Sequence, residues 1–276
     1  MGLSGGHLAV IDGALVRGIE AAGDRGLYLV RMSGMMTLLL LRSVARAVTP
    51  PWRPRPVIRQ IHFIGARSWL LIVVSGAFTG MVVALQFHDT LVRFGTVSLL
   101  GSAVGLSLVR ELGPVLAALM VIGRAGSATC SEIGIMRIDE QIDALECMAI
   151  DPHRFLLAPR LVGGVISQPL LTAMFIVVGV VGGYFVGVGL FGISAGAYFQ
   201  GMYDSVVWND VKMGLIKSIV FGLLIVWICS AKGFLLHLNR DGAFGAEGVS
   251  RATTEAVVLS FIPVLFADYV ISSVMA

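Results

Sequence analysis

The stretch from Ser107 to Phe155 decides the fold: SLVRELGPVLAALMVIGRAGSATCSEIGIMRIDEQIDALECMAIDPHRF. It begins inside an apolar run long enough to cross a bilayer, and that run carries adjacent Arg110 and Glu111 and then Pro114. It continues into an acidic amphipathic segment, Asp139 to Met148. Charge at bilayer depth is costly and by default marks a functional site. A polar helix joined directly to such a span suggests that something outside the membrane acts on it.

The composition is that of a membrane protein. The 276 residues are 57% hydrophobic and 13% charged, with a mean hydropathy of +0.89, whereas a soluble chain carries about 25% charged residues. Apolar runs of spanning length predict five transmembrane helices, at about 68–87, 95–124, 160–186, 212–231 and 251–274. We therefore predict an all-α integral membrane protein with a cytoplasmic coupling helix between the second and third spans.

Residues 1–67 predict an N-terminal amphipathic, interfacial region, and residues 68–276 a transmembrane domain. Met32 to Leu41 is apolar for too few residues to span and is followed by arginines, which favours a helix in the plane of the interface. Thr49 to Pro56, TPPWRPRP, predicts a stiff break.

Arginine and lysine counts set the orientation. The connections before residue 68, at 124–160 and at 232–251 carry nine, four and three basic residues, whereas those at 88–93 and 204–212 carry one each. The basic side is expected to be cytoplasmic. This places the N-terminus in the cytoplasm and the C-terminus outside.

Finer features follow from local composition. His88 to Arg93 predicts a short polar turn, and Phe185 to Tyr203 a loop or a shallow re-entrant segment on the outer side. Ser250 is a plausible N-cap for the fifth span.

Arg110 and Glu111 are the candidate substrate-path pair. Adjacent residues point about 100° apart on a helix, so each needs another partner or a wet cavity. Pro114 offers no N–H to the Arg110 carbonyl, which leaves an acceptor without its helical donor and favours a kink. Arg110 could bind a phosphate or carboxylate in a substrate path. An ion pair with another helix is an equally weighted alternative.

Lys217 and Gln86 are the other two substrate-path candidates. Lys217 lies roughly 7–8 Å inside the fourth span by helical rise, and the simplest expectation is that it snorkels to the outer interface. Gln86, near the outer end of the first span, is expected to be an interfacial residue rather than a ligand contact.

The acidic segment is amphipathic. Ile142, Leu145, Met148 and Ala149 fall on one side, and the acidic residues lie mostly opposite. A charge run of this kind often marks only a solvated face. Because short connections join this helix to two spans, we expect its apolar face to rest on headgroups or in a groove of another protein.

No energy source or catalytic centre is evident in the chain. It contains no G-x-x-x-x-G-K-[ST] motif, so ATP would be bound by a partner. The three cysteines lack zinc-site spacing, and no histidine falls inside a span to activate a serine. We predict a non-enzymatic chain without its own cofactor or metal, and nothing suggests a nucleic-acid partner.

The opening stretch, extended through Leu161, resembles the signature of the MlaE (YrbE) permeases, the membrane subunits of ATP-driven lipid transporters that work with an MCE-domain partner. The segments GVISQPLLT (Gly164 to Thr172), LIKSIVF (Leu215 to Phe221) and GVSRATTEAVV (Gly248 to Val258) also match. The resemblance covers essentially the whole chain, although the first ~30 residues match only in general character.

The resemblance implies a homodimer with a lipid cavity in the inner membrane of a Gram-negative bacterium. Cytosolic ABC ATPase subunits would bind below, often with a STAS-domain protein, and a hexameric MCE ring would sit on the periplasmic side. The substrate would be phospholipid, moved between inner and outer membranes to maintain outer-membrane lipid asymmetry. Arg110 and Glu111 match the family's cavity pair, and Lys217 its lysine. The ATPase-coupling residues would be Arg137, Asp139, Glu140, Asp143, Glu146, Asp151 and Pro152.

Other classes predict different behaviour. An ion-driven secondary carrier would transport without a partner and would show inverted repeats, which the sequence does not reveal. A non-transporting scaffold for MCE proteins would tolerate loss of Arg110 and Glu111. An intramembrane enzyme has the least support.

Overall fold

The computed structural model describes residues 5–49, 54–238 and 245–275, with side chains from Gly26 onward except Leu29. Over these residues the chain is helical apart from short turns, as the sequence predicts. The helices are α1 (Gly5–Val48), α2 (Pro54–Ile61), α3 (Trp69–Phe94), α4 (Leu100–Ser107), α5 (Gly113–Val121), α6 (Ser127–Ile138), α7 (Gln141–Cys147), α8 (Ala158–Tyr184), α9 (Ala195–Ser205), α10 (Trp208–Phe234) and α11 (Ala246–Met275).

Six helical runs in the described part of the chain are long and apolar enough to cross a membrane. Five correspond to the predicted spans: Pro54–Phe94, Val97–Ile138, His153–Leu190, Trp208–Phe234 and Ala246–Met275. The sixth, Gly26–Val48, is the second half of α1. It is longer than the apolar run Met32 to Leu41 because the helix continues through the flanking residues. The interfacial position of α1 stays a prediction.

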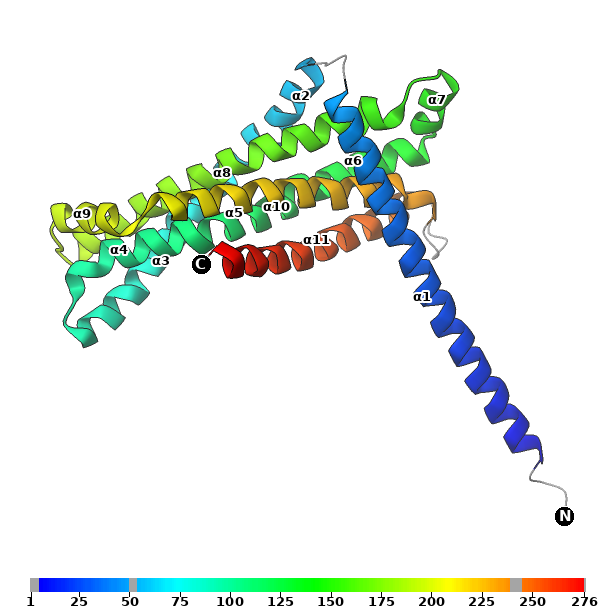
Figure 1. The fold of residues 1–276 in the computed structure, drawn as a ribbon, viewed down its shortest axis with the longest axis horizontal. Helices are drawn as coiled ribbons and strands as arrows, with labels where there is room; N and C mark the ends of the chain where they lie inside the picture. Colours follow the sequence, from blue (N-terminus) through cyan, green and yellow to red (C-terminus); the bar gives the residue numbers. More distant parts are fainter. Residues whose placement is uncertain (1–4, 50–53, 239–244, 276) are drawn as a thin grey trace.

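The helices form an elongated bundle that α1 crosses at a steep angle (Figure 1). Buried Met32, Leu39 and Ser43 recur on one face of α1, and the backbone carbonyl of Met36 accepts a hydrogen bond from Trp227 Nε1 of α10 at 2.8 Å. The second half of α1 is therefore packed on the bundle. Pro50 to Arg53, in the middle of the predicted break, lie outside the described residues.

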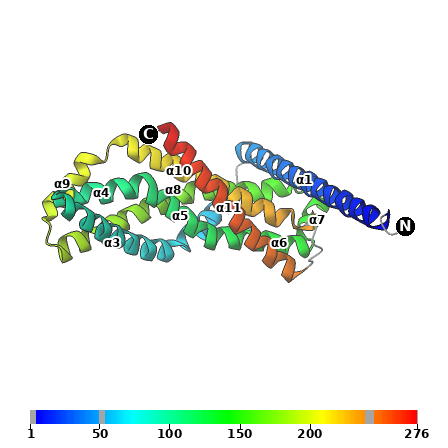
Figure 2. The ribbon, with the colours of Figure 1, turned by 90° about the horizontal axis from the view of Figure 1, so that it is seen from below.

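The ends of the bundle differ. The α7 helix, the end of α10 and the start of α11 lie at one end, and α9 and the α3–α4 turn lie at the other (Figures 1 and 2). We call these the α7 end and the α9 end. The described residues of the connections at 124–160 and 232–251 extend to the α7 end, so the structure groups two of the segments that residue counting placed on one side of the membrane.

The core depends on close contact between backbones. A methyl group added to Gly80 of α3 would overlap the carbonyl of Gly179 in α8, and one added to Gly101 of α4 would overlap the carbonyl of Tyr198 in α9. Small residues at such contacts stabilise membrane helix pairs because lipid provides no hydrophobic drive for helix association.

Two local predictions are wrong, and a third is wrong only in its first alternative, a loop at Phe185 to Tyr203, whereas the re-entrant alternative stays a prediction. His88 to Arg93 is not a turn, because α3 continues to Phe94 and ends where Gly95 adopts a left-handed conformation with φ 69°. Ser250 is not an N-cap, because α11 begins four residues earlier at Ala246. Phe185 to Tyr203 is mostly helical: the segment continues α8 as a π-helical turn, Phe185–Leu190, and then forms most of α9, which packs on α4.

Candidate functional site

The second span is interrupted by a π-helical turn at Leu108–Leu112, between α4 and α5. Pro114 stands in the first turn of α5 and cannot donate to the carbonyl of Arg110. Lys217 Nζ from α10 donates to that oxygen instead, at 2.8 Å. The prediction of an acceptor left open by Pro114 is thereby confirmed. Single π-turns of this kind often accompany functional sites.

Lys217 is the centre of a buried charge network. Its side chain is 0% exposed, and its ammonium donates to Glu111 Oε2 at 2.7 Å as well as to the Arg110 carbonyl. Asp268 of α11 forms an ion pair with it at 2.8 Å. The expectation that Lys217 snorkels to the interface is wrong, because three oxygen atoms from two other helical segments hold it inside the bundle.

Glu111 joins this network from the π-turn but is not enclosed by it. Its second oxygen, Oε1, accepts a hydrogen bond from Ser272 Oγ at 3.1 Å. Even so, 47% of the Glu111 side chain is exposed in the single chain. The residue therefore links the buried lysine to the surface of the bundle.

Arg110 forms its ion pair with Asp210 of α10 and not with the neighbouring Glu111. Its Nε lies 3.4 Å from Asp210 Oδ1, while 39% of its side chain is exposed. The other oxygen of Asp210 accepts a hydrogen bond from the Val207 backbone N–H at 3.1 Å, which caps the first turn of α10. Arg110 is thus paired with a carboxylate that also caps α10, while more than a third of its side chain stays exposed.

We call Arg110, Glu111, Asp210, Lys217 and Asp268 the charged cluster. It combines two cations with three carboxylates and joins the π-turn to α10 and α11. Sequence reasoning missed Asp210 and Asp268. Asp268 had a usable signal, since a carboxylate inside the fifth span is as unusual as the pair in the second. Gln86 is exposed on α3, which contributes nothing to the cluster.

The acidic segment at the α7 end is built differently. The helix α7 is flanked by Glu140 and Ala149, which both have φ 57°. Ile142 is buried in a core cluster with residues of α1, α6, α10 and the π-helical turn His153–Leu157 that precedes α8, and Leu145 is also buried. Met148 is 62% exposed, so its predicted place on the buried side is wrong. The chain itself therefore covers Ile142 and Leu145, whereas Met148 and Ala149 stay exposed, and their contact with headgroups or another protein stays a prediction.

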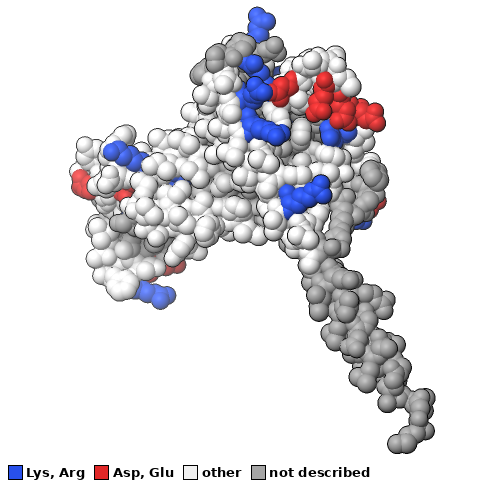
Figure 3. Space-filling model, turned by 45° about the vertical axis from the view of Figure 1, so that its right-hand side comes forward, with Lys and Arg blue, Asp and Glu red and all other residues white. Residues whose placement is uncertain are grey.

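The polar face of α7 remains exposed. The side chains of Asp139, Glu140, Asp143 and Glu146 all face outward, and acidic side chains gather at this end with basic ones nearby (Figure 3). This charged surface, rather than the apolar face, is what α7 presents outside the bundle.

Arg137 connects this helix to the turn after α10. Its guanidinium forms an ion pair with Asp143 at 2.7 Å, and its Nε donates to His237 Nδ1 at 3.0 Å. Burial, and secondarily the Arg137 charge, lowers the pKa of His237 from its ordinary value of 6.5. Arg137 therefore ties three segments together within the chain.

Asp151 and Pro152 close the segment against the bundle. Asp151 Oδ2 lies 2.8 Å from Arg46 Nε of α1, and its Oδ1 accepts the backbone N–H of His153 at 3.0 Å. Pro152 is buried at the start of the next helical run.

Comparison of the chain with known proteins shows the family to which it belongs. The family described as "Permease MlaE" matches residues 57–274, which include the whole charged cluster and α7. The chain belongs to the MlaE permease family. Among MlaE-like relatives, the Haemophilus influenzae "Intermembrane phospholipid transport system permease protein MlaE" is 42% identical over 220 residues, 79% of this chain and 82% of that protein.

Other relatives extend the similarity beyond that species. A "Probable ABC transporter permease protein" of Rickettsia felis is 38% identical over 253 residues, 92% of this chain and 95% of its own length. "Protein TRIGALACTOSYLDIACYLGLYCEROL 1, chloroplastic" of Arabidopsis thaliana is 31% identical over 249 residues, 90% of this chain and 67% of that protein. All of α1 precedes the region that the MlaE family description matches.

Proposed function

We propose that this chain is the transmembrane subunit of an ATP-driven transporter that moves phospholipids between the inner and outer bacterial membranes. Membership of the MlaE permease family supports this proposal, as does the phospholipid transport system named for the Haemophilus relative. The observation that carries it is the charged cluster at bilayer depth, which buries Lys217 completely yet leaves Arg110 and Glu111 partly exposed. The same observations do not favour an ion-driven carrier or a scaffold.

The exposed part of the cluster suggests how a lipid is handled. A guanidinium supplies planar, bidentate donors that suit a phosphate, and the Asp210 contact fixes only Nε of Arg110. Two copies of the chain would enclose acyl chains between apolar helix faces, with Arg110 directed at the headgroup. In this proposal Glu111 and Lys217 position the π-turn, and Gln86 lies near the outer exit.

The α7 segment supports coupling to a separate ATPase. Its acidic face is exposed, Leu145 is buried, and Ile142 packs in a cluster with residues of α1, α6 and α10. A force applied to the acidic face would be transmitted to α1, α10 and the π-helical turn that leads into α8, because Ile142 is packed against them. We propose that a cytosolic ABC ATPase binds here, which places the α7 end and the N-terminus in the cytoplasm and the C-terminus in the periplasm.

The remaining partners follow from the family resemblance. A hexameric MCE protein would exchange lipid with this chain at the α9 end, and a STAS-domain protein would join the ATPase. ATP would be bound by the ATPase subunit, and this chain would act as a non-catalytic homodimer.

The test is reconstitution. The complex purified with its ATPase is placed in proteoliposomes, and transfer of fluorescent phospholipid to an acceptor is followed with ATP. The proposal predicts ATP-dependent transfer that disappears with an ATPase-dead partner. Transfer that continues unchanged with the dead partner would overturn it.

A charge-reversal pair tests the docking surface. Glu146→Lys on α7 is expected to reduce co-purification of the ATPase. Glu247→Lys, an exposed position of α11 at the same end, serves as the matched control and is expected to have little effect. Equal retention of the ATPase by both variants would exclude α7 as its site.

A further inference from the structure

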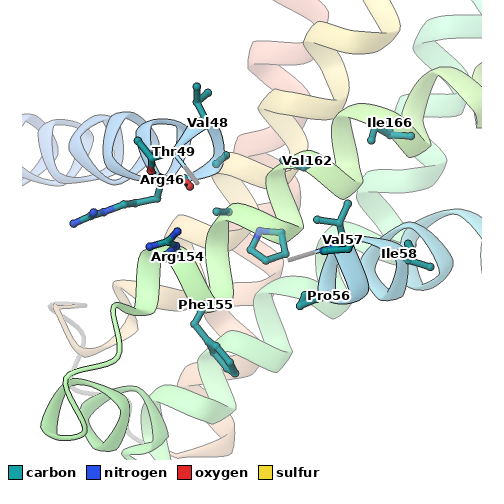
Figure 4. A pocket seen from close by; sticks show the side chains of 14 residues that line it. Arg46, Val48, Thr49, Pro56, Val57, Ile58, Arg154, Phe155, Val162 and Ile166 are labelled. Atoms are coloured by element: carbon teal, nitrogen blue, oxygen red, sulfur yellow. Dashed lines mark hydrogen bonds between the residues drawn. The ribbon is translucent and has the colours of Figure 1, made fainter. Parts of the chain in front are cut away.

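A separate pocket lies between the end of α1 and the starts of α2 and α8 (Figure 4). Its volume is about 560 Å³, within the roughly 300–1,000 Å³ typical of small-molecule pockets. Apart from a few polar residues at one end, its walls are apolar, with Val57 and Ile58 from α2 and Val162 and Ile166 from α8. It shares no residue with the charged cluster.

The pocket has the length of one leaflet. Arg154 and Ile166 line it and are twelve residues apart on one continuous helical run, which corresponds to about 18 Å of helical rise. Half of the hydrocarbon core is about 15 Å thick. Because α2 and α8 both begin candidate spans, Pro54–Phe94 and His153–Leu190, we place the pocket between headgroup level and the middle of the bilayer.

Positive charge lies at the headgroup end. Arg46 and Arg154 line that end, whereas Val57, Ile58 and Ile166 lie at the other (Figure 4). Arg46 contacts Asp151 through Nε, and 53% of its side chain is still exposed. Two arginine side chains, Arg46 and Arg154, therefore line the mouth of the pocket. Basic pockets between membrane helices suit anionic lipid headgroups.

We propose that this pocket binds one anionic glycerophospholipid of the surrounding leaflet as a resident lipid. One acyl chain lies along Val57, Val162 and Ile166, and the phosphate lies between Arg46 and Arg154. This lipid joins α1 to the first and third spans. Through the Arg46–Asp151 contact it also reaches the connection that follows α7. This lipid is distinct from the transported phospholipid. A failure to find it would therefore not contradict the proposed transport function.

The test is lipid retention by the purified full-length chain. The protein is delipidated in mild detergent, mixed with phosphatidylglycerol or phosphatidylcholine, and examined by native mass spectrometry. We compare the wild type with Arg46→Gln/Arg154→Gln, with Val162→Trp, which fills the pocket, and with Arg59→Gln. Arg59 is an exposed arginine of α2 that does not line the pocket and is the matched control. Size-exclusion chromatography checks that each variant is folded.

The expected result is one tightly held phosphatidylglycerol per chain in the wild type and in Arg59→Gln. The double arginine variant should hold it roughly thirtyfold more weakly, as the loss of two basic contacts implies. Val162→Trp should hold none at this site, and phosphatidylcholine should be retained far less well. Equal retention in all four proteins, equal retention of both lipids, or a partner's transmembrane segment cross-linked at Ile166 in the native complex would overturn the proposal.

Discussion

The charged cluster and the α7 segment are both polar, but the cluster has buried ion pairs, whereas α7 has an exposed acidic face above buried apolar residues. In the cluster, Lys217 and Asp268 meet across two helices at 2.8 Å inside the bundle. On α7, the acidic residues face outward, and the apolar residues Ile142 and Leu145 hold the helix in place. Charge organises the first region, and apolar burial organises the second.

The difference shows where each region is sensitive. A charge in the membrane interior is tolerable only when a partner compensates it, so the loss of one partner leaves the other uncompensated. An exposed acidic residue loses little on substitution, because water already solvates it. Stability should therefore depend on polar residues in the cluster and on apolar residues at α7.

The largest effect should come from Lys217→Met. This change leaves Glu111 and Asp268 without their cation and is expected to destabilise the protein by about 3–5 kcal/mol. Thermal unfolding of the purified protein in detergent measures the loss. Lys212→Met, an exposed lysine of the same helix, should change stability by no more than about 0.5 kcal/mol. If the two variants unfold at the same temperature, the ion pairs of Lys217 do not stabilise the protein.

Ile142→Ala should cause the next largest loss of stability. Ile142 is fully buried, and truncating a buried isoleucine leaves a cavity that costs about 2–3 kcal/mol here. The same unfolding measurement applies, with Met148→Ala as the control, because Met148 is exposed and should tolerate truncation. A larger loss from Met148→Ala than from Ile142→Ala would mean that α7 packs through its other face.

Ala149→Gly should raise the stability of the protein, in contrast to the two preceding substitutions. Ala149 has φ 57°, which costs energy for any residue with a Cβ but not for glycine. The substitution should raise stability by about 0.5–1 kcal/mol. Ala144→Gly, inside α7, should instead destabilise by a similar amount. A destabilised Ala149→Gly would show that the left-handed conformation is not retained.

The smallest effect concerns pH at the α7 end. The pKa of His237 is lowered in the folded protein, so the unfolded chain binds the proton more tightly. His237 therefore contributes stability above its unfolded pKa of 6.5, and this contribution is lost as the pH falls through that region. The unfolding temperature should drop less between about pH 7.5 and about pH 5.5 in His237→Gln than in the wild type. An identical drop in both proteins would show that His237 does not contribute to the pH dependence of stability.

Most of the fold could be predicted from the sequence because a bilayer imposes length and apolarity on each span. The charge pair, the effect of Pro114 and the acidic face of α7 are also local features and could be read directly. The partners of Lys217 could not, because Glu111 and Asp268 lie in spans far from it in sequence. Likewise, helical spacing placed Met148 with Ile142, but α7 ends at Cys147, so Met148 leaves that face.

The central claim is that the charged cluster handles phospholipid during ATP-driven transport. The most direct measurement is ATP-dependent lipid transfer by the reconstituted complex carrying Arg110→Gln/Asp210→Asn, which removes both charges of one pair and leaves neither uncompensated. Arg93→Gln, an exposed arginine at the end of α3, is the control. The account predicts roughly tenfold slower transfer by the double variant, equivalent to one lost charged contact to the phosphate, with unfolding temperature and ATPase binding preserved. Transfer at the wild-type rate would contradict it.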